Sequence, residues 1–77
     1  MSVKVKYHGI LGDVAGIKSE NFEKVNTVDN LKKALYARYQ EMKNFVFIMA
    51  VNGTIAGDEI ELRKGDSIDV IPPMPGG

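Results

Sequence analysis

The sequence predicts an α+β domain in which a mixed sheet of four to five strands packs on one α-helix. Residues 3–7 and 67–71 alternate between apolar and polar side chains, which is the period of a half-buried strand. Residues 28–42 instead have the period of an amphipathic helix. Because the first and last strands show the clearest alternation, we expect both to be central, and the long connection between them permits parallel pairing.

The segment before the helix predicts a loop and a short strand. Residues 8–19 contain three glycines, which favour a loop. Residues 21–25 alternate again, so we expect a second strand with Phe22 pointing inward.

The helix has a clear start signal. The side chain of Thr27 can accept a hydrogen bond from a first-turn amide, and Asp29 suits the positive end of the helix. One apolar stripe follows, made of Val28, Leu31, Leu35 and Met42. Asn44 is a plausible stop.

Short extended segments and turns are expected after the helix. Residues 45–51 are continuously apolar and predict one buried strand. Asn52-Gly53 predicts a tight turn, since both residue types tolerate positive φ. Residues 54–55 and 59–62 are candidates for short extended pieces, and residues 64–66 for a further turn before the last strand.

Composition argues against a self-contained enzyme or a nucleic-acid binder. A chain of 77 residues buries only about 60% of its unfolded surface, which leaves little room for a deep pocket. The chain has no cysteine, one histidine and a net charge of zero. Residues 1–39 carry seven Lys/Arg and four Asp/Glu, whereas residues 40–77 carry three and six. Without an apolar spanning run or signal-peptide pattern, we expect a cytoplasmic protein without its own metal or cofactor.

The last six residues have an unusual composition. They are Pro72, Pro73, Met74, Pro75, Gly76 and Gly77. Proline ends the strand and favours extended polyproline II, and six such residues reach roughly 20 Å. Glycine is slim enough to enter a narrow channel in another protein. We therefore expect a domain over residues 1–71 and a flexible tail over residues 72–77, with the Gly77 carboxylate as its working group.

Several motifs resemble the MoaD/ThiS-type ubiquitin-like sulfur carriers, most of all the small subunits of molybdopterin synthases. They are the first strand at residues 3–7, Asp13-Val14-Ala15-Gly16, Thr27-Val28, Ala50-Val51-Asn52-Gly53, Lys64-Gly65-Asp66, and Ile71-Pro72-Pro73 with Gly76-Gly77. The resemblance covers nearly the whole chain and implies a β-grasp fold. Pro75 departs from it, because the family often has alanine there.

The resemblance also implies a mechanism in which this chain is a carrier and not a catalyst. A ubiquitin-activating-like adenylyltransferase would use ATP-Mg to adenylate Gly77, and a sulfur donor would convert the adenylate to a thiocarboxylate. The tail, residues 72–76, would then insert into the large subunit of molybdopterin synthase. There the sulfur would help to build the dithiolene that binds molybdenum or tungsten.

A docking surface is expected where the sheet is not covered by the helix. Either Phe47, Met49 and Val51, or Val46, Ile48 and Ala50, should point to that open side. We assign Phe47 and Met49, together with Ile71, to partner docking, since exposed apolar groups beside the tail suit an interface.

Three other functions fit the same residues. The chain can be a ubiquitin-like modifier that is conjugated through Gly77, or a thiamine-pathway sulfur carrier, although Pro72-Pro73 disfavours the latter. It can also be an interaction module with an incidental tail.

Overall fold

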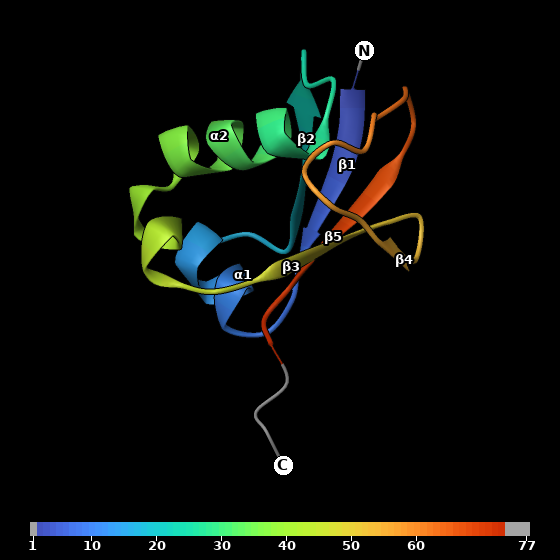
Figure 1. The fold of residues 1–77 in the computed structure, drawn as a ribbon. Helices are drawn as coiled ribbons and strands as arrows, with labels where there is room; N and C mark the ends of the chain where they lie inside the picture. Colours follow the sequence, from blue (N-terminus) through green and yellow to red (C-terminus); the bar gives the residue numbers. More distant parts are fainter. Residues whose placement is uncertain (1, 74–77) are drawn as a thin grey trace.

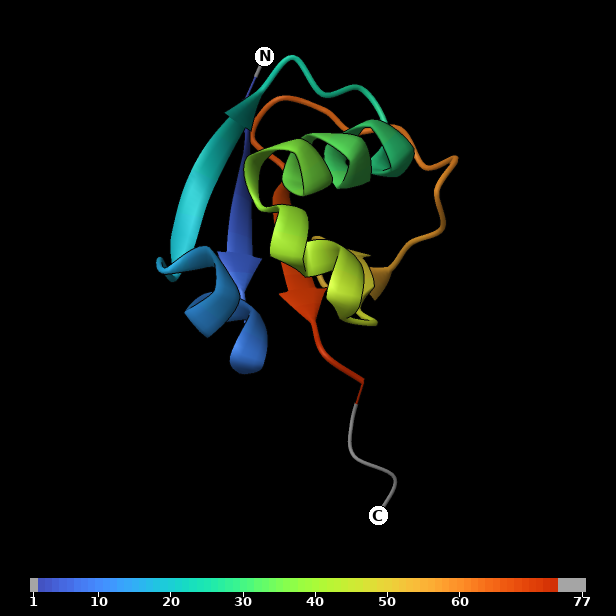
Figure 2. The ribbon, with the colours of Figure 1, turned by 90° about the vertical axis from the view of Figure 1, so that its left-hand side faces the viewer.

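The computed structural model describes residues 2–73, which form a five-stranded sheet covered on one face by helices (Figures 1 and 2). The strands are β1 Ser2–Tyr7, β2 Ser19–Glu23, β3 Ile48–Val51, β4 Thr54–Ile55 and β5 Ser67–Ile71. The helices are α1 Ile10–Ala15, α2 Val28–Arg38 and the 3-10 helix η1 Gln40–Asn44. The predicted α+β class is therefore confirmed.

The sheet has the strand order β2-β1-β5-β3-β4. Strands β1 and β5 pair in parallel, with Tyr7 opposite Val70, and they occupy inner positions as predicted. Strand β2 pairs antiparallel with β1, and β3 pairs antiparallel with both β4 and β5. Strand β5 therefore has a hydrogen-bonded neighbour on each side, which fixes the place where the chain leaves the sheet.

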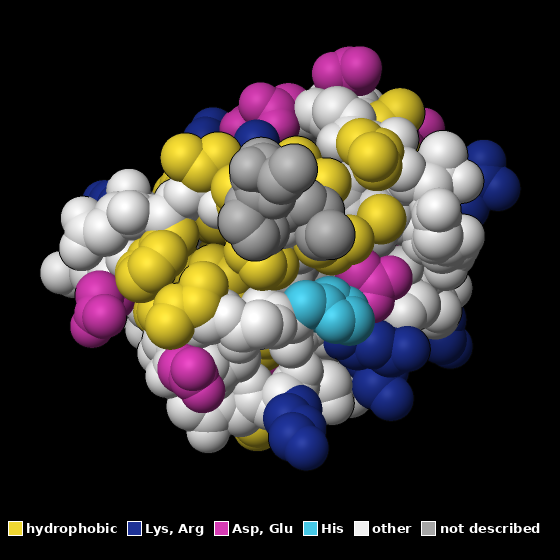
Figure 3. Space-filling model, turned by 90° about the horizontal axis from the view of Figure 1, so that it is seen from below, with side chains coloured by type: hydrophobic (Ala, Val, Ile, Leu, Met, Phe, Trp, Pro, Cys, Tyr) yellow, Lys and Arg dark blue, Asp and Glu magenta, His cyan; other side chains and the backbone are white. Residues whose placement is uncertain are grey.

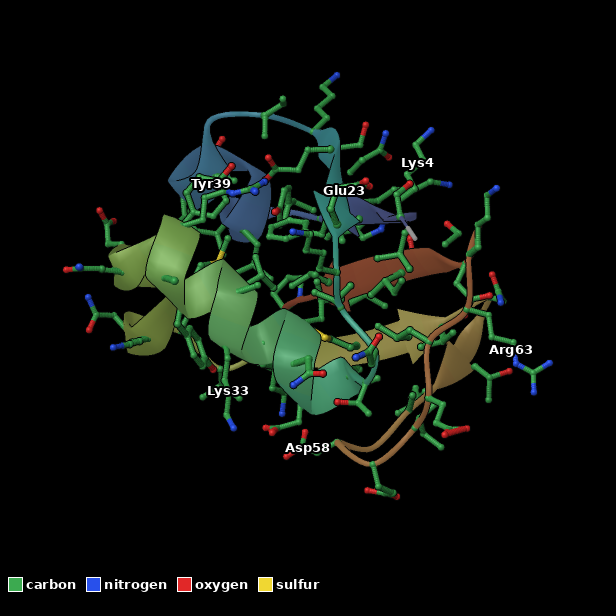
Figure 4. The ribbon with its side chains drawn as sticks, turned by 90° about the horizontal axis from the view of Figure 1, so that it is seen from above. Lys4, Glu23, Lys33, Tyr39, Asp58 and Arg63 are labelled. Atoms are coloured by element: carbon green, nitrogen blue, oxygen red, sulfur yellow. The ribbon has the colours of Figure 1, made fainter. Side chains whose placement is uncertain are left out.

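The core lies between the sheet and the helices. Alternate side chains of the two central strands point to the helices and are buried, namely Val3, Val5, Tyr7, Ile68 and Val70. Helix α2 covers them with Val28, Leu31 and Leu35, each fully buried. Burying a side chain of this size contributes about 1.5–3 kcal/mol. Figure 4, seen from above, shows α2 lying across the strands.

The predicted helix over residues 28–42 is divided in the structure. Thr27 caps α2 as expected, because its Oγ1 accepts a hydrogen bond of 3.1 Å from the Asn30 amide. The α-helix ends at Arg38, and η1 begins at Gln40 after a non-helical Tyr39. Met42 is nevertheless fully buried, because η1 brings it back onto the core.

Two predictions for single segments were wrong. Residues 8–19 are not all loop, since they contain α1, which is held on the core by the fully buried Leu11. Residues 45–51 are not one buried strand, since β3 begins only at Ile48 and Val46 is 75% exposed. In both cases the secondary structure depends on packing against the rest of the molecule, which local composition does not reveal.

The turns agree with the residue types that were used to predict them. Asn52 and Gly53 have φ of 50° and 88°, and together they connect β3 to β4. Gly65 has φ of 85° in the turn before β5. Residues 59–62 form no strand, although Glu61 makes an isolated bridge with Thr27.

Candidate functional site

Strand β5 leads the chain out of the sheet at the end where the predicted tail begins (Figure 1). Ile71 is its last residue and lies opposite Ile48 of β3. Pro72 is half-buried and Pro73 is exposed. The other predicted tail residues, Met74, Pro75, Gly76 and Gly77, lie outside the described residues.

The junction between β1 and α1 lies against the first tail residue. The backbone N–H of His8 donates a hydrogen bond of 3.0 Å to the carbonyl oxygen of Val70. Gly9 follows with φ of 56°, and a Cβ atom added there would be 3.2 Å from Cγ of Pro72. Glycine therefore allows both the backbone conformation and the close approach of Pro72.

The open face, which is the sheet face opposite the helices, carries exposed apolar side chains. Ile48 and Ile71 are register partners, and Ile55 lies opposite Ala50 one strand further out. Val46, Ile48 and Ile55 are 75%, 40% and 69% exposed. We call Ile48, Ile55 and Ile71 the apolar patch. Figure 3 shows hydrophobic side chains gathered around the base of the tail.

The structure corrects two of the three residues that were assigned to docking. Met49 is only 2% exposed, because it lies opposite the inward-pointing Val70 and shares its direction. Phe47 is half-buried, packs against the core and has its ring centroid 6.1 Å from that of Tyr36. Ile71 remains on the open face beside Ile48. Of the alternative set, Val46 and Ile48 are exposed, whereas Ala50 is only 5% exposed.

A partly buried polar cluster joins the end of α2 to the outer strands of the sheet. It was not predicted from the sequence. Glu20 Oε2 accepts hydrogen bonds of 2.5 Å from the hydroxyl groups of Tyr7 and Tyr39. Its Oε1 accepts one of 2.9 Å from Arg38, whose guanidinium lies 4.0 Å from the ring centroid of Phe22. The cluster therefore fixes the end of α2 against β1 and β2.

The cluster also shifts the protonation equilibria of its members. Burial would raise the pKa of Glu20, but hydrogen bonds from Tyr39, Tyr7 and Arg38 together hold that pKa below its usual value. The pKa values of Tyr7 and Tyr39 are raised, mainly by burial and then by bonding to the Glu20 carboxylate. Neither tyrosine is therefore an acid near neutral pH, and the cluster has a structural role.

The described part of the chain has neither a cluster of metal-ligating side chains nor a helix that could span a membrane. Within residues 2–73, no three His, Asp or Glu side chains are grouped as metal ligands. In the same range, no helix is long and apolar enough to span a membrane. The features that remain are the apolar patch and the point where the tail leaves it.

Comparison with known proteins identifies a family that this sequence matches. The model of the ThiS family matches residues 5–77. The molybdopterin synthase sulfur carrier subunit of Chlamydomonas reinhardtii is 31% identical over an alignment of 83 positions, which covers 100% of both chains.

Solved structures with the same fold include the following two. A Pyrococcus furiosus protein assigned as molybdopterin converting factor subunit 1 superimposes with a TM-score of 0.90 at 29% identity, covering 96% of this chain and 99% of that one. A complex of subunits 1 and 2 of the molybdopterin-converting factor from Helicobacter pylori contains a chain with a TM-score of 0.73 and 25% identity, with 100% of both chains covered. The sheet is thus that of a ubiquitin-like β-grasp domain.

Proposed function

We propose that this chain, which belongs to the ThiS family and is a sulfur carrier, holds its sulfur as a thiocarboxylate on Gly77 and delivers it for molybdopterin synthesis. One observation carries this proposal. Strand β5 is paired on both sides and delivers the chain to Pro72 beside the apolar patch, and the sequence then ends in Gly76-Gly77.

The physical requirements of such a carrier agree with this arrangement. A terminal carboxylate must reach an active site on another protein while the carrier domain docks outside it. The patch offers apolar area for docking next to the tail. The final glycines present no side chain that would obstruct a narrow channel.

Sulfur loading takes place in three chemical steps. The Gly77 carboxylate attacks the α-phosphorus of ATP, and pyrophosphate leaves. The terminal sulfur of a donor persulfide then bonds to the carbonyl carbon as AMP leaves. A thiol finally attacks the donor's own sulfur in the acyl disulfide, so that a disulfide forms between thiol and donor and the thiocarboxylate leaves. The residues of this chain position the terminus, and the activating enzyme supplies ATP-Mg and the catalytic groups.

Two protein partners follow from this chemistry. One is a ubiquitin-activating-like adenylyltransferase, which forms the adenylate. The other is the large subunit of a molybdopterin synthase, which receives the thiocarboxylate on the tail. The Helicobacter pylori complex of subunits 1 and 2 supports a large subunit as the second partner.

Intact-mass spectrometry tests the sulfur carrier chemistry directly. The full chain is incubated with its activating enzyme, ATP-Mg and a persulfide donor, and we expect the mass change for exchange of one oxygen for sulfur. A chain that lacks Gly77, or one that is extended by an alanine, should not be loaded. Lys33→Gln, which lies on the helix face, is the matched control. Loading of the deletion variant would refute the role of Gly77, and high-mass conjugates in cells would favour a protein modifier instead.

Calorimetry with the large subunit tests the docking surface. Ile71→Asp places a charge in the apolar patch, so we expect at least about a tenfold loss of affinity. Ile60→Asp is the control, since Ile60 is an isoleucine that is 40% exposed but lies in the segment that contacts the start of α2. Equal affinities for the two variants, with both folded by circular dichroism, would exclude the patch as the docking surface.

A further inference from the structure

A basic groove of about 760 Å³ lies beside the tail base, where β1, α1 and the start of β2 meet. Its lining includes Lys4 and Lys6 of β1 and Lys18, which precedes β2. Asp13 is the one carboxylate among the lining residues. Gly9, which approaches Pro72, also lines the groove, so the groove and the tail base are adjacent.

The sheet register explains why the groove is positively charged. Lys4 lies between Asn21 and Ser67, and Lys6 lies between Ser19 and Asp69. The carboxylate of Asp69 is already engaged, because its Oδ1 is 2.8 Å from Nε2 of His8. Among residues 2–73, Asp69 makes this contact with His8 and forms no ion pair with Lys6.

The cations of α2 are paired with carboxylates instead. Lys32 pairs with Asp58 at 2.7 Å, Lys33 pairs with Asp29 at 3.1 Å, and Arg38 pairs with Glu20 at 2.9 Å. Within residues 2–73, the three lysines of the groove have no such ion pair. One solvated lysine is ordinary, but several unneutralised cations on one concave face raise the local positive potential.

We propose that the basic groove binds a carboxylate-rich segment of the synthase large subunit while the tail of this chain is inserted in it. This inference rests on the proposed function, because it assigns a second contact to the same docking event. The groove continues the apolar patch, since Asp69 lies beside Ala50 and the next row contains Ile71 and Ile48. Figure 3 shows His8 between the basic side chains and the hydrophobic ones around the tail.

The groove acts mainly on the rate of association. Charges at the rim of an interface steer the encounter and change the association rate more than the dissociation rate. Their effect extends over about 8 Å at 0.15 M ionic strength and is reduced by added salt. The apolar patch, by contrast, determines how long the complex lasts.

Stopped-flow kinetics measure the rate of association with the large subunit. The measurements run from about 50 to 400 mM NaCl, the range over which salt screening becomes strong. For full-length Lys4→Glu plus Lys6→Glu at the lowest salt, we expect about a tenfold slower association than for the unmodified chain. The difference should shrink as salt is added, while the dissociation rate changes little. Lys4→Gln plus Lys6→Gln should give an intermediate rate, and both pairs should melt within a few degrees of the unmodified chain. Lys33→Glu plus Lys43→Glu makes the same change in net charge on the helix layer and should leave the rate unchanged.

Each remaining outcome overturns the inference. If the groove pair associates like the control pair while Ile71→Asp still weakens binding, steering is wrong and the docking surface stands. If the groove pair associates faster than the unmodified chain, the surface of the large subunit that faces the groove is basic, and the inference is wrong. Salt-dependent self-association of the unmodified chain in sedimentation, lost in the groove pair, would show that the groove binds a second copy instead. If the unmodified chain does not bind the large subunit, the proposed function falls as well.

Discussion

The direction in which β3 presents its side chains can be tested by removing two adjacent ones. Met49 is 2% exposed and packs in the core, whereas its neighbour Ile48 is 40% exposed on the open face. Met49→Ala should therefore lower the free energy of unfolding by about 2–5 kcal/mol, because it leaves a cavity. Ile48→Ala should cost less than about 1 kcal/mol, which is the range of strand propensity.

These costs are large enough to measure against the total stability. At roughly 0.05–0.15 kcal/mol per residue, this chain has about 4–12 kcal/mol in all. Urea unfolding followed by far-ultraviolet circular dichroism gives both values. The binding assay should show the reverse order, with weaker binding to the large subunit for Ile48→Ala and unchanged binding for Met49→Ala under conditions where it is folded. A larger stability loss for Ile48→Ala would refute the orientation of β3.

Two further predictions concern the elements on either side of the docking surface. Glu20→Gln should lower stability by about 1–3 kcal/mol at neutral pH, since it weakens the bonds of Tyr7, Tyr39 and Arg38. Because the pKa of Glu20 is lower folded than unfolded, this stabilisation is present above the ordinary glutamate pKa of about 4.3 and is lost as the pH falls through the folded value. Urea titrations at several pH values should show the gap closing in acid, and a constant gap would contradict the cluster. Gly9→Ala should lower the melting temperature of the domain more than Gly16→Ala. Both glycines have positive φ, but only Gly9 approaches Pro72. Equal melting temperatures for the two variants would show that the contact is unimportant.

The elements that were predicted correctly have local signals. The alternation of residues 3–7 and 67–71 identified β1 and β5, and the length of the connection between them gave their parallel pairing. Thr27 marked the start of α2, and Asn52-Gly53 marked the hairpin turn. In each case the residue type has a backbone or hydrogen-bonding preference that acts within a few positions of the chain.

The apolar segment before the hairpin shows where such signals end. Residues 45–51 are all apolar, so alternation cannot say which side chains face the core. Only pairing with β5 decides it, because Met49 must share the direction of Val70. The exposed side chains of this segment were therefore predicted wrongly for Met49, which is 2% exposed, whereas Val46 and Ile48 are 75% and 40% exposed.

The sequence by itself determined the fold class, the central strands, the cap of α2 and the composition of the tail, because these depend on neighbours along the chain. Tertiary structure alone decided that α1 forms around the buried Leu11, that Glu20 gathers two tyrosines and an arginine, and that Lys4 and Lys6 lie beside the tail base. Those contacts join residues that are far apart in sequence. The free energy of these contacts depends on burial and on distances that are set only when the sheet and the helices pack together.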